Sequence, residues 1–241
     1  MIFKSIFNLV FPENLSCLVC GNDVFDNPYY ICKNCNKTLP FLVGELCAHC
    51  GEPLISDGAF CKRCKGKKFY FDKAMSVFVY DDVIRTLVHK LKYSGQKHIA
   101  NSFAKYMYDY FCKTKLKADV IIPVPLCEKR LKTRGYNQSY LIANKMSEFL
   151  KIDCKDNSLL RIKETPNQTE LNYADRQTNL KDAFKVSNKK DILNKIVLLG
   201  DDVYTTGATL TECSKTLKKA GAKAVYAITV AHTVRKEVED D

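Results

Sequence analysis

The segment IVLLGDDVYTTGATL, Ile196 to Leu210, places paired carboxylates beside a cluster of hydroxyl groups. Its first part is a continuous apolar run, which is typical of a strand buried on both faces of a parallel sheet. Asp201 and Asp202 follow at the carboxyl end of that strand, and the stretch 205–209 leads into apolar residues at helical spacing. The segment therefore predicts a strand, a polar loop and a helix in succession.

Strand and helix patterns alternate along the chain after Lys73. The apolar strand-like runs are AMSVFVY (74–80), DVIIPVP (119–125), KIVLLG (195–200) and AVYAITVA (224–231). The helix-like stretches are DDVIRTLVHKLKYS (81–94), NSFAKYMYDYFCKT (101–114), NQSYLIANKMSEFLK (137–151) and TLTECSKTLKKAGA (209–222). This alternation predicts an α/β domain whose parallel sheet is flanked by helices on both faces. In such folds ligands bind beyond the carboxyl ends of the strands.

The loop after the acid pair has the chemistry of an anion site. A helix N-terminus presents free N–H groups, a glycine lets the backbone approach the ligand, and hydroxyl groups add donors. The residues concerned are Thr205, Thr206, Gly207, Ala208 and Thr209. Asp201 and Asp202 would repel the same anion, so they suit sugar hydroxyls or a metal ion. Ribose 5-phosphate carries both features, whereas an aspartate turn with a threonine helix cap is the structural alternative.

Composition sets the class of protein. The chain has 241 residues, 46% of them hydrophobic, and a formal charge of +11, which favours anionic partners or reflects solvated lysines. Neither a G-x-x-x-x-G-K-[ST] loop nor a G-x-G-x-x-G loop after a strand occurs. The start MIFKSIFNLVFPENLS is too interrupted for a membrane span and predicts a helix that packs on the protein, with peripheral membrane association as the alternative. We expect a cytoplasmic protein.

Eight of the 12 cysteines fall in four C-x-x-C pairs, which in a reducing compartment indicate metal binding. Two such pairs form a tetrahedral thiolate cage for zinc. The pairs are Cys17 and Cys20, Cys32 and Cys35, Cys47 and Cys50, and Cys61 and Cys64. The spacing predicts two tandem zinc ribbons, 17–35 and 47–64, although the equally long spacer between the second and third pairs leaves a crossed arrangement open. His49 lies inside a pair and is expected to be a bystander.

Two closed four-cysteine sites are structural, because they leave no coordination position for a reacting water. Each filled site carries about −2, so two zinc ions would lower the formal charge from +11 to about +7. The ribbons either bind nucleic acid or a partner protein, or stabilise a small domain that lacks a sufficient core. We expect this domain to span residues 1–72 and the α/β domain to span 73–241.

The segment VLLGDDVYTTGATL resembles the 5-phosphoribosyl 1-pyrophosphate (PRPP) signature of type I phosphoribosyltransferases. IPVPLCEKRLKTRGYNQSYLIA (122–143), RIKETPNQTELNYADRQTNLKDAF (161–184) and the N-terminal double zinc ribbon resemble the ComF (ComFC) family. The resemblance covers essentially the whole chain. Tyr136 stands where phenylalanine is frequent, and Cys127 stands where histidine is common.

The resemblance implies a role for each polar segment. Asp201 and Asp202 would hold the ribose 2- and 3-hydroxyls, and the loop 205–209 would hold the 5-phosphate. The pyrophosphate and Mg²⁺ would be held by Lys92, Tyr93 and Gly95, although an exposed helix end is the alternative reading of that lysine. Residues 161–184 resemble the mobile loop that closes over PRPP and excludes water.

Arg130 and Arg134 follow the strand DVIIPVP, so we expect them in a loop at the same sheet edge as the aspartates. There they would clamp pyrophosphate or a nucleic-acid phosphate, and solvated arginines before a helix are the alternative. Asn137 and Gln138 lie beside them, and Gly135 permits the turn.

Three functions fit these observations. The resemblance implies a PRPP-binding, phosphoribosyltransferase-like protein associated with natural transformation and the handling of single-stranded DNA, with competence helicases or recombination-mediator proteins as partners. A nucleobase salvage phosphoribosyltransferase is the second function. A non-enzymatic, zinc-dependent nucleic-acid-binding module is the third, and it predicts DNA binding with a steep salt dependence. The acceptor substrate is not encoded in any recognisable segment.

Overall fold

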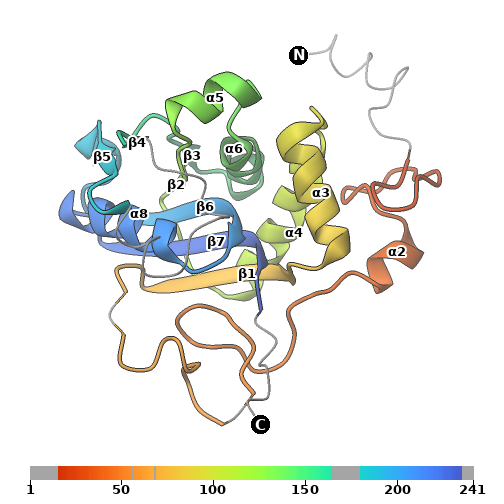
Figure 1. Ribbon diagram of the computed structural model, residues 1–241, viewed down its shortest axis with the longest axis horizontal. Coiled ribbons are helices and arrows are strands. Elements are labelled where there is room, and N and C mark those ends of the chain that lie inside the picture. Colours follow the sequence, from red (N-terminus) through yellow and green to blue (C-terminus); the bar gives the residue numbers. More distant parts are fainter. Residues whose placement is uncertain (1–15, 56, 68, 164–179, 235–241) are drawn as a thin grey trace.

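The protein is described by a computed structural model that covers residues 16–55, 57–67, 69–163 and 180–234 (Figure 1). Two predictions fall outside these residues: the N-terminal helix and most of the loop expected to close over the ligand, residues 164–179. Every helix among the described residues falls short of the length and apolar character needed to cross a bilayer.

A five-stranded parallel sheet forms the centre of the molecule (Figure 1). Its spatial order is β1 (Lys73–Val79), β7 (Ala224–His232), β6 (Ile196–Tyr204), β2 (Val120–Pro123) and β3 (Asp153–Cys154). All the pairings within this sheet are parallel. The four strands predicted from apolar runs are therefore confirmed, and the two-residue β3 at the edge is an addition.

Successive residues of β6 enter opposite cores, as the period of a strand requires. Val197 and Leu199 pack with α8 (Ala208–Lys219), whereas Leu198 packs with residues of α3 (Asp82–Tyr93), α4 (Ile99–Lys113) and α6 (Gln138–Leu150). Figure 1 shows α8 on one side of the sheet and the other three helices on the opposite side. The predicted covering of both faces is confirmed.

Several short elements were not predicted. They are α2 (Lys33–Lys37), α5 (Glu128–Arg134), a 3₁₀ turn η2 (Lys189–Asp191) and an antiparallel pair formed by β4 (Leu159–Arg161) and β5 (Phe184–Val186). Each is too short for a hydrophobic period to be visible in the sequence. The β4–β5 pair packs on the α8 side of the sheet, where Leu159 and Phe184 join the core.

The end of β6 differs from the prediction in a way that creates an opening. The apolar run suggested that the strand ends near Leu199, but β6 continues to Tyr204 because β7 pairs with it as far as His232. On its other side, β2 stops at the pair Pro123↔Gly200. The residues of β6 after Gly200 therefore have a strand neighbour on one side and a space on the other.

The cysteines form two tandem clusters, which settles the question of their pairing. One cluster holds Cys17, Cys20, Cys32 and Cys35, and the other holds Cys47, Cys50, Cys61 and Cys64. The crossed arrangement is thereby excluded for the described residues. We call the segments that carry them ribbon 1 (residues 16–35) and ribbon 2 (residues 47–64).

The ribbons contact different parts of the α/β domain. Ribbon 1 lies against α4, where the Tyr29 hydroxyl donates to Asp109 Oδ2 at 2.6 Å. Ribbon 2 lies against β1, where the Ala74 N–H donates to the His49 carbonyl at 2.7 Å. Cys47, Cys50 and Cys64 belong to the core cluster that also contains Phe71. Ribbon 1 contributes Cys17, Val24 and Ile31 to the core cluster on the other side of the sheet. Both ribbons are therefore part of the hydrophobic core.

The burial of individual cysteines predicts unequal costs of replacing them. Cys50 is fully buried beside the sheet, whereas Cys20 is exposed. We expect Cys50→Ser to lower the free energy of unfolding by about 3 kcal/mol or more, and Cys20→Ser to lower it by less, because only the first change places a hydroxyl group at a fully buried position. Denaturant unfolding with zinc analysis of each variant measures this, and equal losses for the two variants would contradict it.

Candidate functional site

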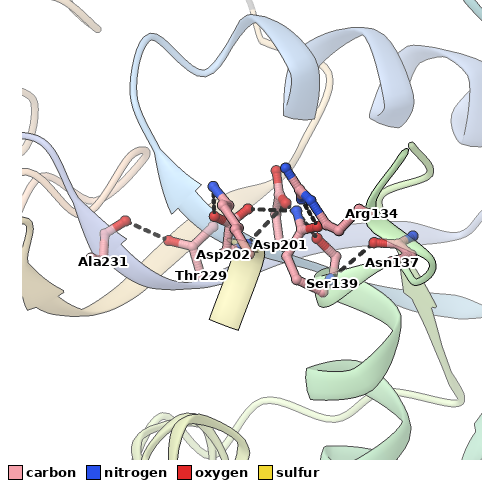
Figure 2. A network of polar contacts seen from close by, with 9 residues as sticks. Arg134, Asn137, Ser139, Asp201, Asp202, Thr229 and Ala231 are labelled. Carbon is pink, nitrogen blue, oxygen red and sulfur yellow. Dashed lines mark hydrogen bonds and ion pairs between the residues drawn. The ribbon is translucent and has the colours of Figure 1, made fainter. Parts of the chain in front are cut away.

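The acid pair lies where β6 passes the end of β2. Asp201 Oδ1 accepts hydrogen bonds from the Ser139 hydroxyl at 2.8 Å and from the Asp202 N–H at 2.9 Å. Asp202 Oδ1 accepts a hydrogen bond from the Gln138 side-chain amide at 3.2 Å. Figure 2 shows Asp201 and Asp202 of β6 beside Ser139 of α6. The first turn of α6 therefore fixes the orientation of both carboxylates.

An ion pair completes the surroundings of Asp202. The Lys92 ammonium, in the last turn of α3, contacts Asp202 Oδ2 directly. Burial alone would lower the pKa of Lys92, but the charge of Asp202 outweighs burial and raises this pKa above its ordinary value. Burial would raise the pKa of Asp202, but Lys92 outweighs it and lowers that pKa. Both groups are therefore charged at neutral pH.

Asp201 has the opposite titration behaviour. Burial, and then the negative charge of Asp202, raise the pKa of Asp201 to about 8, which the hydrogen bond from Ser139 opposes. No ion pair is recorded for the Asp201 side chain among the described residues. The pair thus holds one carboxylate and one carboxyl group near neutral pH, because two adjacent buried charges would repel each other.

The corner between α5 and α6 brings arginine and aromatic side chains to the site. Arg134 donates a hydrogen bond to Gln138 Oε1, and its guanidinium lies 4.9 Å from the centre of the Tyr93 ring. The Tyr136 hydroxyl donates to the Leu91 carbonyl, which ties the corner to α3. The expectation that the arginines lie in a loop was wrong, because Arg130 and Arg134 belong to α5, which ends at Gly135 in a left-handed conformation.

The predicted phosphate loop enters α8 at Gly207, whose φ is +77°. A Cβ atom at this position would lie 2.3 Å from the Tyr204 hydroxyl oxygen, so a larger residue is destabilising both through this clash and through the positive φ. The first N–H groups of α8 have no partner within the helix. The Ala208 N–H makes a 3.4 Å contact with Thr206 Oγ1, which is long enough to be exchanged for an anion.

A cavity of about 1070 Å³ connects these parts. Of the residues predicted to bind the ligand, Lys92, Tyr93, Gly95, Arg130, Arg134, Asp201, Asp202, Thr205, Gly207 and Thr209 line it. Thr206 and Ala208 are absent from its lining, although they belong to the same loop. The structure thus brings together ten predicted residues that come from three separate segments of the chain, 92–95, 130–134 and 201–209.

Positive charge dominates the described lining of the cavity. Its cationic residues are Lys92, Lys129, Arg130, Arg134 and Arg161, against the acidic residues Asp201 and Asp202. Arg161 comes from β4 and lies over the Phe184 ring at 5.8 Å, and burial lowers its pKa. A cavity with this balance suits a ligand that carries several negative charges.

Ser139 and Tyr204 are among the lining residues for which no role was predicted from the sequence. Ser139 is the second residue of α6, next to the specific segment R-G-Y-N-Q. Tyr204 is the last residue of β6 and stacks on His232 with ring centres 4.5 Å apart. Its aromatic character after an acid pair was the available signal.

The two cysteine clusters fit zinc. In each cluster the ligand atoms lie within 4.8 Å of one another, and all four donors are thiols, the set found in closed structural sites. The N–H groups of Cys32 and Cys61 each donate to a cluster sulfur at 3.3 Å, which supports thiolate charge. His49 belongs to neither cluster and stacks on Phe71 instead, so the expectation of a bystander is confirmed.

Comparison with known proteins identifies the family. The family model described as a double zinc ribbon domain matches residues 6–65. Competence protein F of Haemophilus influenzae is 33% identical over 218 residues, which cover 88% of this chain and 94% of the relative. The chain belongs to the ComF family. Other relatives of this ComF-family chain are DNA utilization protein YhgH of Escherichia coli, 27% identical over 90% of this chain and 97% of the relative, and Competence protein ComFC of Bacillus subtilis, 26% identical over 80% of each.

Solved phosphoribosyltransferase structures also match part of the ComF-family chain. A purine phosphoribosyltransferase from Pyrococcus horikoshii is 23% identical, covers 55% of this chain and 71% of its own, and gives a TM-score of 0.34. A hypoxanthine phosphoribosyltransferase from Staphylococcus aureus is 12% identical, covers 60% and 70%, and gives a TM-score of 0.36. Membership of the ComF family rests on the sequence relatives.

The titration of Asp201 predicts how stability depends on pH. Its pKa rises from 3.8 to about 8 on folding, so the folded chain holds this proton more tightly and the free energy of unfolding falls as pH rises between about 4 and 8. Asp201→Asn keeps the Oδ1 acceptor and lacks the proton. We expect it to be more stable than wild type at pH 8 by at least about 1 kcal/mol, and less so at pH 5.

Denaturant unfolding at both pH values measures this difference. Asp153→Asn is the matched control, because the Asp153 side chain is 72% exposed in an ion pair with Lys155, away from the cavity. A gap between Asp201→Asn and wild type that does not widen from pH 5 to pH 8 would show that the carboxyl group titrates normally.

Gly207 predicts a second stability effect. Gly207→Ala adds a clash with Tyr204 to the strain of a positive φ, whereas Gly66→Ala adds strain alone, since at Gly66 φ is +71° and nothing lies within 4 Å of a Cβ. We expect losses of about 3 kcal/mol at Gly207 and about 1 kcal/mol at Gly66. Equal losses in denaturant unfolding would show that Tyr204 moves aside freely.

Proposed function

We propose that this ComF-family protein binds PRPP with Mg²⁺ in the 1070 Å³ cavity and acts in DNA uptake for natural transformation. The observation that best supports this proposal is that an acid pair and a helix N-terminus face one strongly cationic cavity. Acceptors suited to a sugar diol and donors suited to a phosphate group thereby stand within one site. A ligand with a ribose between two phosphate-bearing ends satisfies both requirements.

The ribose and its 5-phosphate have separate partners in this proposal. Asp201 and Asp202 accept hydrogen bonds from the ribose hydroxyls, and the start of α8 holds the 5-phosphate through its N–H groups. Gly207 allows the phosphate to approach the backbone closely. Asp201 is suited to the sugar because Ser139 and the Asp202 N–H occupy only its Oδ1 atom.

Cationic residues of the protein are available to bind the pyrophosphate end of PRPP. Lys92, at the end of α3, is positioned for it together with Tyr93, Gly95 and Arg134, all of which line the cavity. Mg²⁺ bound with PRPP would neutralise part of the phosphate charge and help the pyrophosphate to leave. Because Lys92 contacts Asp202, pyrophosphate and Asp202 would share or compete for this ammonium.

Relatives and charge support the connection to DNA. Proteins named as competence and DNA utilization proteins are similar to this chain over most of its length. The formal charge of +11 favours association with nucleic acid, so we infer single-stranded DNA as a partner in the cytoplasm, with competence helicases or recombination-mediator proteins as protein partners. Transfer of the phosphoribosyl group to an acceptor is the activity that this site would support.

Calorimetric titration of PRPP into the zinc-loaded protein, with and without Mg²⁺, tests the proposal. We expect Mg²⁺-dependent binding, weakened about tenfold or more in Asp201→Asn and Asp202→Asn because each variant replaces one of the two carboxyl groups proposed to bind the sugar hydroxyls. Asp153→Asn should bind as wild type does. Absence of binding by the wild-type protein, or wild-type affinity in Asp201→Asn, would overturn the placement of the sugar.

A parallel titration with labelled single-stranded DNA separates the DNA role from the PRPP role. The aspartate variants should keep their DNA affinity, and this affinity should fall steeply with salt. Arg134→Ala would weaken both ligands if they share the sheet edge. Product formed from PRPP and a free nucleobase would instead establish the salvage reaction, and DNA binding without PRPP binding would establish the nucleic-acid module.

A further inference from the structure

Ribbon 2 reaches the phosphate loop through a single arginine. Arg63 lies between two cysteines of the second cluster, and its side chain is only 20% exposed. Its Nε and Nη2 atoms lie 3.0 and 2.9 Å from Glu52 Oε2. Its Nη1 atom donates a hydrogen bond to the Thr205 carbonyl at 3.3 Å. The guanidinium thus spans the gap between the zinc ribbon and the loop at the start of α8.

We propose that Arg63 is a positioning residue, through which the zinc-bound ribbon 2 holds the phosphate loop in its anion-binding conformation. The proposal rests on the proposed function for its ligand, PRPP, and on the geometry for its mechanism. Ribbon 2 would then contribute to binding in the cavity without any of its cysteines touching the ligand.

The peptide plane explains how the contacts of one carbonyl group set the loop. The Thr205 carbonyl accepts from Arg63 and, at 3.4 Å, from the Thr233 hydroxyl, and Arg63 supplies the charged donor. The carbonyl and the N–H of a trans peptide point in opposite directions, and no cis peptide occurs among the described residues. With the Thr205 carbonyl held toward ribbon 2, the N–H of Thr206 points away from the ribbon. If the carbonyl were released, this peptide could rotate and place its negative end where the anion binds.

The other partner of Arg63 is fixed by the same ribbon. The Glu52 carbonyl accepts a hydrogen bond from the Cys47 N–H at 2.8 Å, so the backbone that carries Glu52 is part of the zinc knuckle. Arg63 and Glu52 therefore keep their separation only while the knuckles of ribbon 2 are closed around the metal. A planar guanidinium can bind the carboxylate and the carbonyl together, which a compact ammonium cannot do.

An aromatic stack provides a second link between ribbon 2 and the loop. His49 of ribbon 2 stacks on Phe71. The Phe71 ring contacts Tyr204 edge to face, with ring centres 6.5 Å apart, and Tyr204 in turn stacks on His232. Thr233 donates through its hydroxyl to the Tyr204 carbonyl at 3.3 Å. The stack anchors the residue before the loop, so Arg63 acts on a short segment whose start is already fixed.

Ribbon 1 offers the contrast. Its described residues contact α4, and none of them lines the cavity. The two ribbons thus have the same ligand set and different neighbours. Only ribbon 2 has a recorded contact with the loop 205–209, and this difference gives the proposal its specificity.

Amide hydrogen exchange on the full-length, zinc-loaded protein tests the proposal without any ligand. In Arg63→Met, with zinc content equal to wild type, we expect the amides of Ala208 and Thr211, which donate to Thr206 Oγ1 and to the Gly207 carbonyl, to exchange about tenfold faster, the factor for loss of one hydrogen bond to a charged donor. Arg85→Met is the matched control, because Arg85 is exposed, pairs with Asp82 and lies outside the cavity lining. Unchanged exchange at Ala208 and Thr211 in Arg63→Met would overturn the proposal.

Arg63→Lys covers the case in which Arg63→Met fails to fold or to hold zinc. The lysine keeps a charge beside Glu52 but cannot also reach the Thr205 carbonyl. The proposal therefore expects retained zinc with faster exchange at Ala208 and Thr211, and unchanged exchange there overturns it. PRPP titration distinguishes the two proposals. If the wild type binds PRPP and the Arg63 variants bind it about three- to tenfold more weakly, both proposals are supported. Failure of the wild type to bind PRPP overturns the proposed function alone, because hydrogen exchange still decides the role of Arg63.

Discussion

Two adjacent carboxyl groups at the end of a buried strand place the strongest physical constraint on this structure. Asp201 and Asp202 cannot both be ionised in their partly desolvated position without a compensating charge. The protein divides the pair, giving Asp202 the Lys92 ammonium and a buried amide, and giving Asp201 a hydroxyl and an N–H. The result is one charged and one titrating group, both held in place before any ligand arrives.

This division determines where two helices lie. The last turn of α3 has to deliver Lys92, and the first turn of α6 has to deliver Gln138 and Ser139 to the same point. Helix caps fix both: Asp81 accepts from the Ile84 N–H at the start of α3, and Asn137 accepts from the Ser139 N–H at the start of α6. Local capping and the charge balance of the site therefore support the same arrangement.

Much of this arrangement follows from the sequence, for identifiable reasons. Continuous apolar runs and helical spacing predicted four of the five strands of the parallel sheet and four helices, and the C-x-x-C pairs predicted two zinc sites. The acid pair and Gly207 indicated the site because their chemistry is local to one segment. The ion pair of Lys92 with Asp202 and the contact of Arg63 with Thr205 could not be predicted, since each joins segments more than 100 residues apart whose approach depends on the whole fold. The helix α5 was not predicted, because its seven residues are rich in charge and show no apolar period.

The excess of cationic residues around the cavity links the stability of the protein to the binding of an anionic ligand. Five cationic side chains and two acidic ones line it, so its described lining holds more positive than negative residues. Such an excess opposes folding when the site is empty and attracts anions from solution. A polyanionic ligand removes the repulsion and binds the folded state alone, so it stabilises the protein in proportion to its affinity. The zinc ribbons reduce this positive charge, because each filled four-thiolate site carries a net negative charge. They also add rigid structure beside the α/β domain. Ribbon 2 makes both contributions beside the loop 205–209, which in the proposed function holds a phosphate group close to backbone N–H groups.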